Sequence, residues 1–154
     1  MDYIGISKIL KGTYYRQLLA SVFLVVVAYL LKYFHQLDSV QVPGRAFNVV
    51  VATLAGVFGI ALPIFYRSYF VYKIRNRKQI SLDTFIRFER VLLTTALVTP
   101  YFLVVSLLLN MMEATNILIT LFAIYAAYYY FPSGKKVLFE MKIFRLLPAK
   151  KKED

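Results

Sequence analysis

Four long runs of uncharged, mostly apolar residues constrain the fold of this chain more than any other feature. They cover residues 17–31, 46–66, 91–112 and 114–134. A helix needs about 20 residues to cross a hydrocarbon core about 30 Å thick. The first run reaches that length over residues 14–34, because Arg16 and Lys32 can extend their charges outward along aliphatic stems. The pattern therefore predicts an all-α integral membrane protein with four transmembrane helices.

Composition supports a membrane setting. Apolar residues make up 60% of the chain and the mean hydropathy is +0.61, which exceeds what a soluble domain of 154 residues needs for its core. The charged residues lie in a few clusters between the runs instead of covering a whole surface. We expect residues 1–154 to form a single four-span membrane domain, with a cytoplasmic loop over residues 67–90 and a basic cytoplasmic tail over residues 135–154.

The positions of Lys and Arg indicate the orientation. Of the 19 basic residues, only Lys32 and Arg45 fall in the first predicted external loop, and none falls within residues 110–116. Cations near the ends of spans are retained on the cytoplasmic side. We therefore predict an antiparallel bundle with both termini cytoplasmic. The absence of an Asn-x-Ser/Thr sequon favours a bacterial inner membrane over a glycosylated cell surface.

Several classes of function are disfavoured by what the sequence lacks. There is no Cys, which excludes thiol redox chemistry and thiolate metal sites, and the four runs carry no ionisable residue of the kind that coupled transporters and metal-dependent membrane enzymes place at depth. The single His35 lies near the outer end of the first run. We predict no catalytic residue, no metal site and no cofactor. The net charge of +11 lies beside the spans, so we assign it to anionic phospholipids at the cytoplasmic face and not to nucleic acid.

The second run contains small residues at a spacing that favours close packing of helices. Ala52 and Gly56, and likewise Ala55 and Gly59, are four residues apart. Because lipid tails compete for larger apolar side chains, small residues mark helix contacts in membranes. We expect this helix at the centre of the bundle. The spacing leaves open whether its partner is another span or a separate subunit.

Two prolines should bend the second and third helices. Pro63 and Pro100 each remove a helical hydrogen bond. Pro100 is flanked by Thr95, Thr99 and Tyr101, whose hydroxyls would either satisfy the freed carbonyls or line a polar path. We expect the first of these roles, in which the hydroxyls bond to their own helix.

The loop between the second and third runs is predicted to be a helical elbow. The second helix should continue to about Arg77, and Ser81 or Asp83 should cap a new helix. That helix would place Phe85, Phe88 and Leu92 on one face, with Arg87 and Arg90 elsewhere. The segments before the first run and after the fourth are amphipathic and suited to the inner membrane surface. The periodicity of the tail fits either a helix or a strand.

The elbow would gather a cluster of charged and aromatic side chains at the cytoplasmic face. Its members are Arg67, Arg87, Glu89, Arg90, Tyr66 and Tyr69. Such a cluster suits a lipid headgroup or an acidic segment of a partner. We favour an ion-pair network that fixes the elbow over a dedicated binding site.

These features favour a protein that works by contact. The leading hypothesis is a non-catalytic accessory, scaffold or assembly subunit of a larger inner-membrane complex. Besides the lipid bilayer, its partners would be another membrane protein or further copies of itself. One alternative is a small oligomeric channel or facilitator with the segment around Thr95 to Tyr101 as its path. Another is a lipid-headgroup-binding enzyme or flippase that uses the cytoplasmic Arg cluster.

Overall fold

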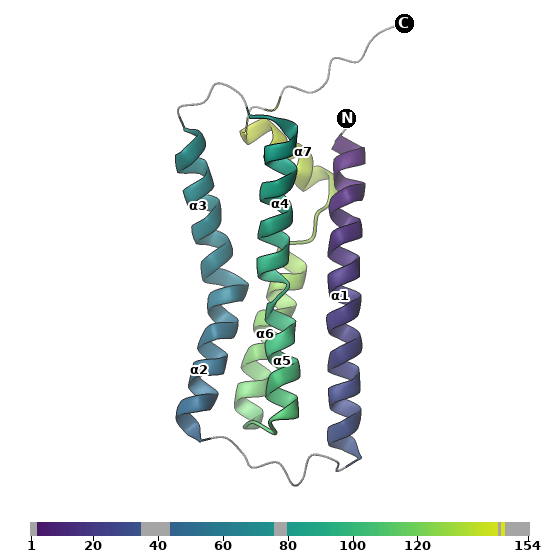
Figure 1. The fold of residues 1–154 in the computed structure, drawn as a ribbon, viewed down its shortest axis with the longest axis vertical. Helices are drawn as coiled ribbons and strands as arrows, with labels where there is room; N and C mark the ends of the chain where they lie inside the picture. The colour runs from purple at the N-terminus through teal and green to yellow at the C-terminus, as the bar shows by residue number, and fades with distance from the viewer. Residues whose placement is uncertain (1–2, 35–43, 76–79, 145, 147–154) are drawn as a thin grey trace, which may run out of the picture.

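The computed structural model describes residues 3–34, 44–75, 80–144 and 146, and every regular element among them is helical (Figure 1). In chain order the elements are α1 (Tyr3–Tyr33), α2 (Arg45–Gly56), the π-helical segment η1 (Val57–Ala61), α3 (Leu62–Ile74), α4 (Leu82–Ala96), α5 (Thr99–Leu108), α6 (Glu113–Tyr129) and α7 (Gly134–Ile143). The prediction of an all-α chain is confirmed for these residues.

Three helical rods are long and apolar enough to cross a membrane. They cover Ile4–Tyr33, Arg45–Ile74 and Leu82–Leu108. α6 has 17 residues, and it passes the same test only together with α7, from which it is bent by 74°. The chain therefore has three candidate spans, or four if the bent pair counts as one. The predictions of four crossings and of their orientation stay predictions.

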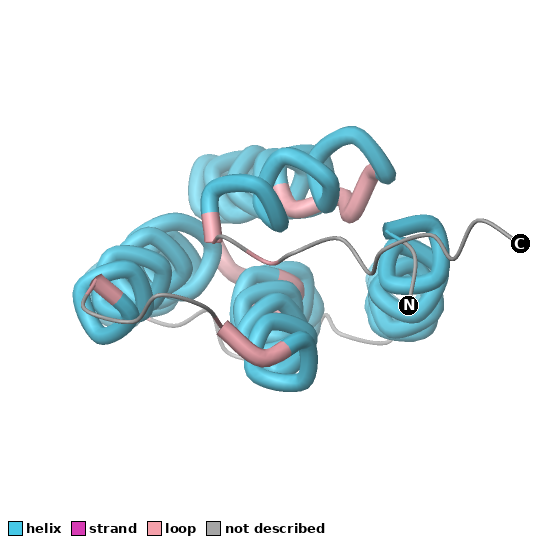
Figure 2. Tube along the Cα trace, turned by 90° about the horizontal axis from the view of Figure 1, so that it is seen from above, coloured by secondary structure: helices cyan, strands magenta, loops and turns pink. Residues whose placement is uncertain are grey.

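The rods lie side by side and run alternately in opposite directions (Figure 1). α7 crosses the end of the bundle that also holds the start of α1, the end of α3 and the start of α4, and we call this the α7 end. Viewed along the rods, α4 and α5 lie between α1 on one side and α2 and α3 on the other (Figure 2).

The expectation that the second rod is central is wrong. In the most apolar stretch of each rod, 44% of residues are buried for α4 with α5, 28% for the second rod and 17% for α1. Small residues allow close approach on one face only, and the second rod leaves large side chains such as Phe65 and Tyr72 exposed on the others.

Both prolines interrupt a helix where the sequence predicts it. η1 immediately precedes α3, and Pro63 lies in the first turn of α3. Because proline lacks an N–H and its ring crowds the carbonyl four residues earlier, a wider π turn at this point relieves the clash. α4 ends at Ala96 and α5 starts at Thr99, just before Pro100.

Two helices differ in length from the predicted spans. α1 begins at Tyr3 instead of residue 14, because Ile6, Leu10 and Tyr14 recur at helical spacing and are buried in the core of the α7 end. The segment before the first run therefore continues the span helix and does not form a separate surface helix. α6 ends at Tyr129, before the predicted residue 134, and Ser133 begins α7 by accepting a hydrogen bond from the Lys136 N–H at 3.2 Å.

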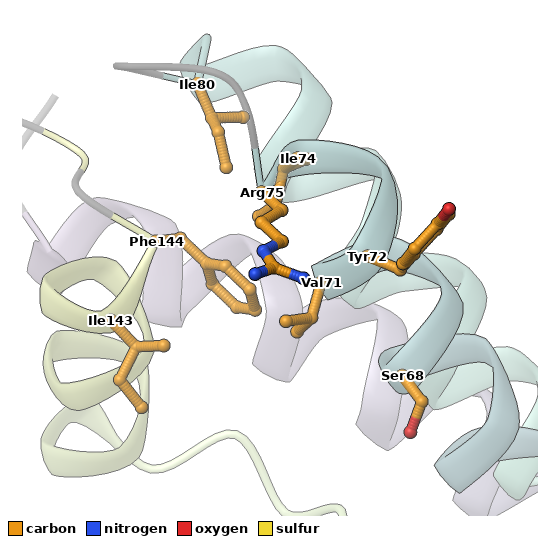
Figure 3. A pocket seen from close by; sticks show the side chains of 8 residues that line it. All are labelled: Ser68, Val71, Tyr72, Ile74, Arg75, Ile80, Ile143 and Phe144. Atoms are coloured by element: carbon orange, nitrogen blue, oxygen red, sulfur yellow. The ribbon is translucent and has the colours of Figure 1, made fainter.

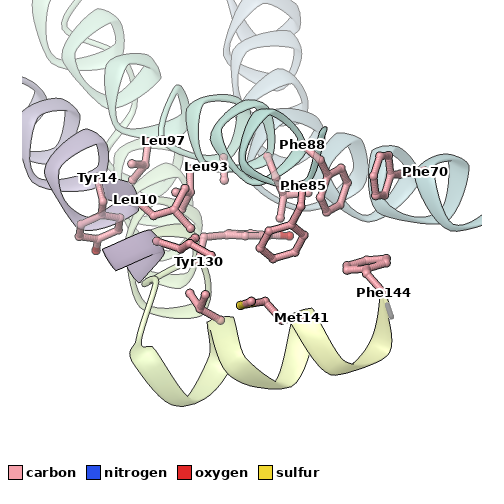
Figure 4. Close-up of a cluster of buried hydrophobic side chains, with 14 of the residues drawn as sticks. Leu10, Tyr14, Phe70, Phe85, Phe88, Leu93, Leu97, Tyr130, Met141 and Phe144 are labelled. Atoms are coloured by element: carbon pink, nitrogen blue, oxygen red, sulfur yellow. The ribbon is translucent and has the colours of Figure 1, made fainter. Parts of the chain in front are cut away.

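A hydrophobic cluster joins five helices at the α7 end (Figure 4). In the predicted elbow, Phe85, Phe88 and Leu92 are buried while Arg87 and Arg90 are exposed, which confirms the predicted face of α4. Ser81, one of the two predicted caps, is the N-cap residue of this helix, but its side chain makes no capping hydrogen bond. Met141 and Phe144 come from α7 and its C-terminal end, so the described first part of the predicted tail forms a helix that packs across the bundle, while residues 147–154 lie outside the described residues.

Candidate functional site

Arg67 forms a two-point ion pair with Glu140. Its Nη1 lies 2.9 Å from Oε1 of Glu140, and its Nη2 donates a hydrogen bond to Oε2 at 3.2 Å. The Glu140 side chain is 5% exposed and the Arg67 side chain 35%. A guanidinium that contacts both carboxylate oxygens is held strongly and in a defined orientation. The pair therefore attaches α7 to α3.

Two more charged residues surround this ion pair. Glu89 on α4 is buried, and it interacts electrostatically with Glu140, Lys136 and Arg67. Lys136 donates a hydrogen bond from Nζ to the carbonyl oxygen of Tyr129 at 2.8 Å. Two acids and two cations thus meet where α3, α4 and α7 converge. The arrangement fits a structural network better than an open binding site.

Sequence reasoning missed Glu140 and Lys136. A signal for Glu140 was present, because Val137, Glu140, Met141 and Phe144 recur at helical spacing, so a helical tail would place the carboxylate on its apolar face. An acid on an apolar face requires a cationic partner. The pattern alone did not identify which of the many cations supplies it.

The other predicted site residues are divided between separate surfaces. Tyr66, Tyr69 and Arg87 line a groove of about 420 Å³ between α3 and α4, which we call the α3–α4 groove; its remaining lining residues are Phe70, Lys73, Ile74, Asp83, Thr84 and Phe88. Arg90 is exposed and does not line this groove. The predicted cluster is thus two sites, one built on Arg67 and Glu89 and the other on Arg87 and the two tyrosines.

A second hollow of about 420 Å³ lies between α3 and α7 (Figure 3). Its walls are mainly apolar, with Val71 and Ile74 on α3 and with Ile143 and Phe144 at the end of α7. The Arg75 side chain extends into the space beside Phe144.

A third hollow, of about 370 Å³, lies between α2 and α6, and we call it the α2–α6 groove. It is lined by Asn48, Val49, Ala52, Thr53, Gly56, Ala114, Thr115, Leu118 and Phe122. Two of the four predicted packing residues, Ala52 and Gly56, therefore border an open groove. The other two face the interior, since Ala55 is fully buried and a Cβ built on Gly59 would lie 2.7 Å from Oγ1 of Thr99.

The residues around the second proline are packed inside the bundle. Thr99 is fully buried and Pro100 is buried, whereas Thr95 and Tyr101 are partly exposed. The Thr99 hydroxyl has no hydrogen-bond partner among the described residues, so it does not bond to its own helix as expected. None of the three hollows is lined by these four residues.

Within residues 3–34, 44–75, 80–144 and 146, no group of three or more His, Cys, Asp or Glu residues is placed to hold a metal ion. No known protein family, no curated protein and no solved structure matches the chain.

Proposed function

We propose that the chain is a four-span protein of the bacterial inner membrane that works by contact, as a non-catalytic accessory, scaffold or assembly subunit of a larger complex. Both termini would be cytoplasmic. The observation that carries the proposal is the α2–α6 groove, which is open on the outer surface of the bundle and lined mainly by small or apolar side chains. The occupant we propose is a transmembrane helix of a different membrane protein.

The groove has the properties that helix association in lipid requires. Ala114 is small and exposed, so a second backbone can approach it closely, while Ala52 and Gly56 form the floor of the groove beside Phe122 and Thr53 and Thr115 supply hydroxyls at its edge. Because lipid tails cover large apolar side chains as well as a protein does, association in the membrane depends on such close contact. A helix that fills the groove gains packing that a mobile lipid tail does not supply.

The surroundings of the charged residues also favour a role in binding another protein over a role in catalysis or transport. Arg67, the centre of the predicted headgroup site, is already paired with Glu140. The packing of Gly59 against Thr99 likewise gives no support to a polar path along the segment that a channel would use. The channel and the headgroup enzyme therefore remain the weaker proposals.

The proposed orientation is supported by the positions of the described cations. Lys8, Lys73, Arg87, Lys135 and Lys142 belong to the helix segments at the α7 end, whereas Lys32 and Arg45 mark the opposite end. Cation-rich ends of helical bundles face the cytoplasm. This distribution supports a cytoplasmic α7 end.

Photo-crosslinking from the groove tests the proposal. A benzoylphenylalanine placed at Leu118, inside the groove, should form an adduct of defined mass with one membrane protein in native membranes, and the same probe at Phe23 on α1 should not. Thr53→Phe fills the groove and should lower the adduct yield about tenfold, because overpacking a contact costs about 1–3 kcal/mol. The matched control is Val50→Phe, which enlarges an exposed residue of α2 outside the groove.

Three results would overturn the proposal. One is an adduct with lipid alone, and a second is an equal loss of adduct in Thr53→Phe and Val50→Phe. The third is an adduct between tagged and untagged copies of this chain, which would assign the groove to self-association.

A further inference from the structure

The rim of the α3–α4 groove carries three exposed charged side chains. Lys73 on α3 and Asp83 and Arg87 on α4 line this groove, and all three are exposed. None of them forms a hydrogen bond or ion pair with another residue in the described part of the chain. In the neighbouring network Arg67 and Glu140 are paired with each other, whereas these three side chains at the rim are available to a ligand.

The wall of the groove is aromatic and firmly packed. The Phe88 ring stacks on Phe70 with centroids 4.0 Å apart and on Tyr66 with centroids 5.4 Å apart. Tyr69 adds an exposed phenol to the lining. Phenol rings are favoured at the depth where a membrane changes from hydrocarbon to headgroups, since one end of the ring is apolar and the other polar.

Polarity changes along one face of α3 in the order found along a phospholipid. Leu62, Phe65, Tyr66, Tyr69 and Lys73 recur at helical spacing and so share this face. A ligand on it would meet exposed apolar side chains first, then phenols, and finally the cation at the rim. An acyl chain, a glycerol backbone and a headgroup follow each other in the same order. A free phosphate or an acidic peptide would use only the rim.

We propose that the α3–α4 groove binds a phospholipid whose headgroup carries both a phosphate and a primary amine. Arg87 and Lys73 bind the phosphate, with the planar guanidinium suited to two of its oxygens. Asp83 accepts hydrogen bonds from the ammonium group. A carboxylate at the rim attracts an ammonium and repels a further anion, so the groove discriminates in favour of a zwitterionic headgroup over a purely anionic one. This site is independent of the helix-docking groove between α2 and α6.

Lipid titration of the purified full-length chain tests the proposal. The chain in a mild detergent is titrated with palmitoyl-oleoyl phosphatidylethanolamine or phosphatidylglycerol, and bound lipid is counted by native mass spectrometry. Phosphatidylethanolamine should bind more tightly. Lys73→Gln and Arg87→Gln should each weaken both lipids about fivefold. Asp83→Asn should weaken phosphatidylethanolamine about fivefold without weakening phosphatidylglycerol.

The matched control is Arg90→Gln, an exposed cation of the same helix outside the groove, which should bind both lipids as the unmodified chain does. All four substitutions replace exposed side chains, and an unchanged melting temperature shows that each variant is folded.

Four outcomes would overturn the proposal. The first is equal or tighter binding of phosphatidylglycerol by the unmodified chain. The second is an effect of Arg90→Gln as large as that of Arg87→Gln, which would mean general attraction by cations. The third is displacement of the lipid by free phosphoethanolamine at equal concentration, since the acyl chains would then contribute nothing. The fourth is displacement by a poly-glutamate peptide, which would assign the groove to an acidic protein segment.

Discussion

Glu140→Gln tests whether the ion pair with Arg67 holds α7 on the bundle. The substitution keeps the size of the side chain and removes its charge, so the two contacts at 2.9 and 3.2 Å lose their electrostatic component. Removing one partner of a fully buried pair costs about 3–5 kcal/mol. Arg67 is 35% exposed, so water solvates part of the freed guanidinium, and Glu89 is still within electrostatic reach. We therefore expect a loss of about 2 kcal/mol in the free energy of α7 docking.

Hydrogen–deuterium exchange of the chain in lipid nanodiscs measures this loss. Amides of Gly134–Ile143 should exchange about thirtyfold faster in Glu140→Gln, because exchange there reports the opening of α7. Glu113→Gln removes an exposed acid at the opposite end of α6 and should leave α7 unchanged.

A double variant identifies the pair as the cause. Arg67→Leu with Glu140→Leu removes both charges of the ion pair, so it should lose less than the sum of the two single variants. The reasoning is refuted if the losses are additive, or if Glu140→Gln speeds exchange in α7 no more than Glu113→Gln does.

Two further pairs of substitutions examine packing, with melting temperature in detergent as the measurement. Gly59→Ala should destabilise the chain by about 1–3 kcal/mol because its Cβ would overlap Thr99. The control Gly12→Ala, where a Cβ meets nothing within 4 Å, should stabilise α1 by up to about 1 kcal/mol. Similar melting temperatures for the two variants would contradict the tight contact between Gly59 and Thr99. Phe88→Ala should lower the free energy of unfolding by about 3 kcal/mol because the ring is buried and stacked. The control Phe139→Ala, on the exposed side of α7, should change it by no more than about 0.5 kcal/mol. Equal effects would show that the hydrophobic cluster at the α7 end is not a packed core.

The helical rods were predictable because two local signals coincide in them. Uncharged runs of about 20 residues are too long and too apolar for helices on the surface of a soluble protein. The helical spacing of Phe85, Phe88 and Leu92 identifies which side of α4 is buried. The effect of a proline is also local, so the interruptions before Pro63 and Pro100 followed from the sequence.

The end of α6 was harder to predict because apolar residues continue past it. Tyr128 to Phe131 extend the apolar run past the end of the helix at Tyr129, and the first residues after this run are Pro132 and the capping Ser133. Val137 to Phe144 then fit the period of a helix and that of a strand almost equally. The packing of α7 across four other helices depends on contacts between distant parts of the chain.

Residue spacing also could not predict that the charged cluster is divided into two sites. Arg67 and Glu140 are 73 residues apart, and 19 cations compete for eight acids. Which pair forms is decided by where α7 docks. Because Arg67 is paired with Glu140 on α7, it does not form a common site with Arg87, which lines the α3–α4 groove together with Lys73.

The π turn η1 determines which residues of the second rod meet the rest of the protein. A regular helix advances about 100° per residue, so the extra residue in a π turn rotates everything after it back by about that angle. Ala52 and Ala55 before the turn and Pro63 and Phe70 after it are all buried, and their spacing fits one stripe of a regular helix. Because of the π turn, the buried side after the turn therefore points about that angle away from the buried side before it. The turn lets a single helix place small residues against α5 and α6 near one end and aim Arg67 at α7 near the other.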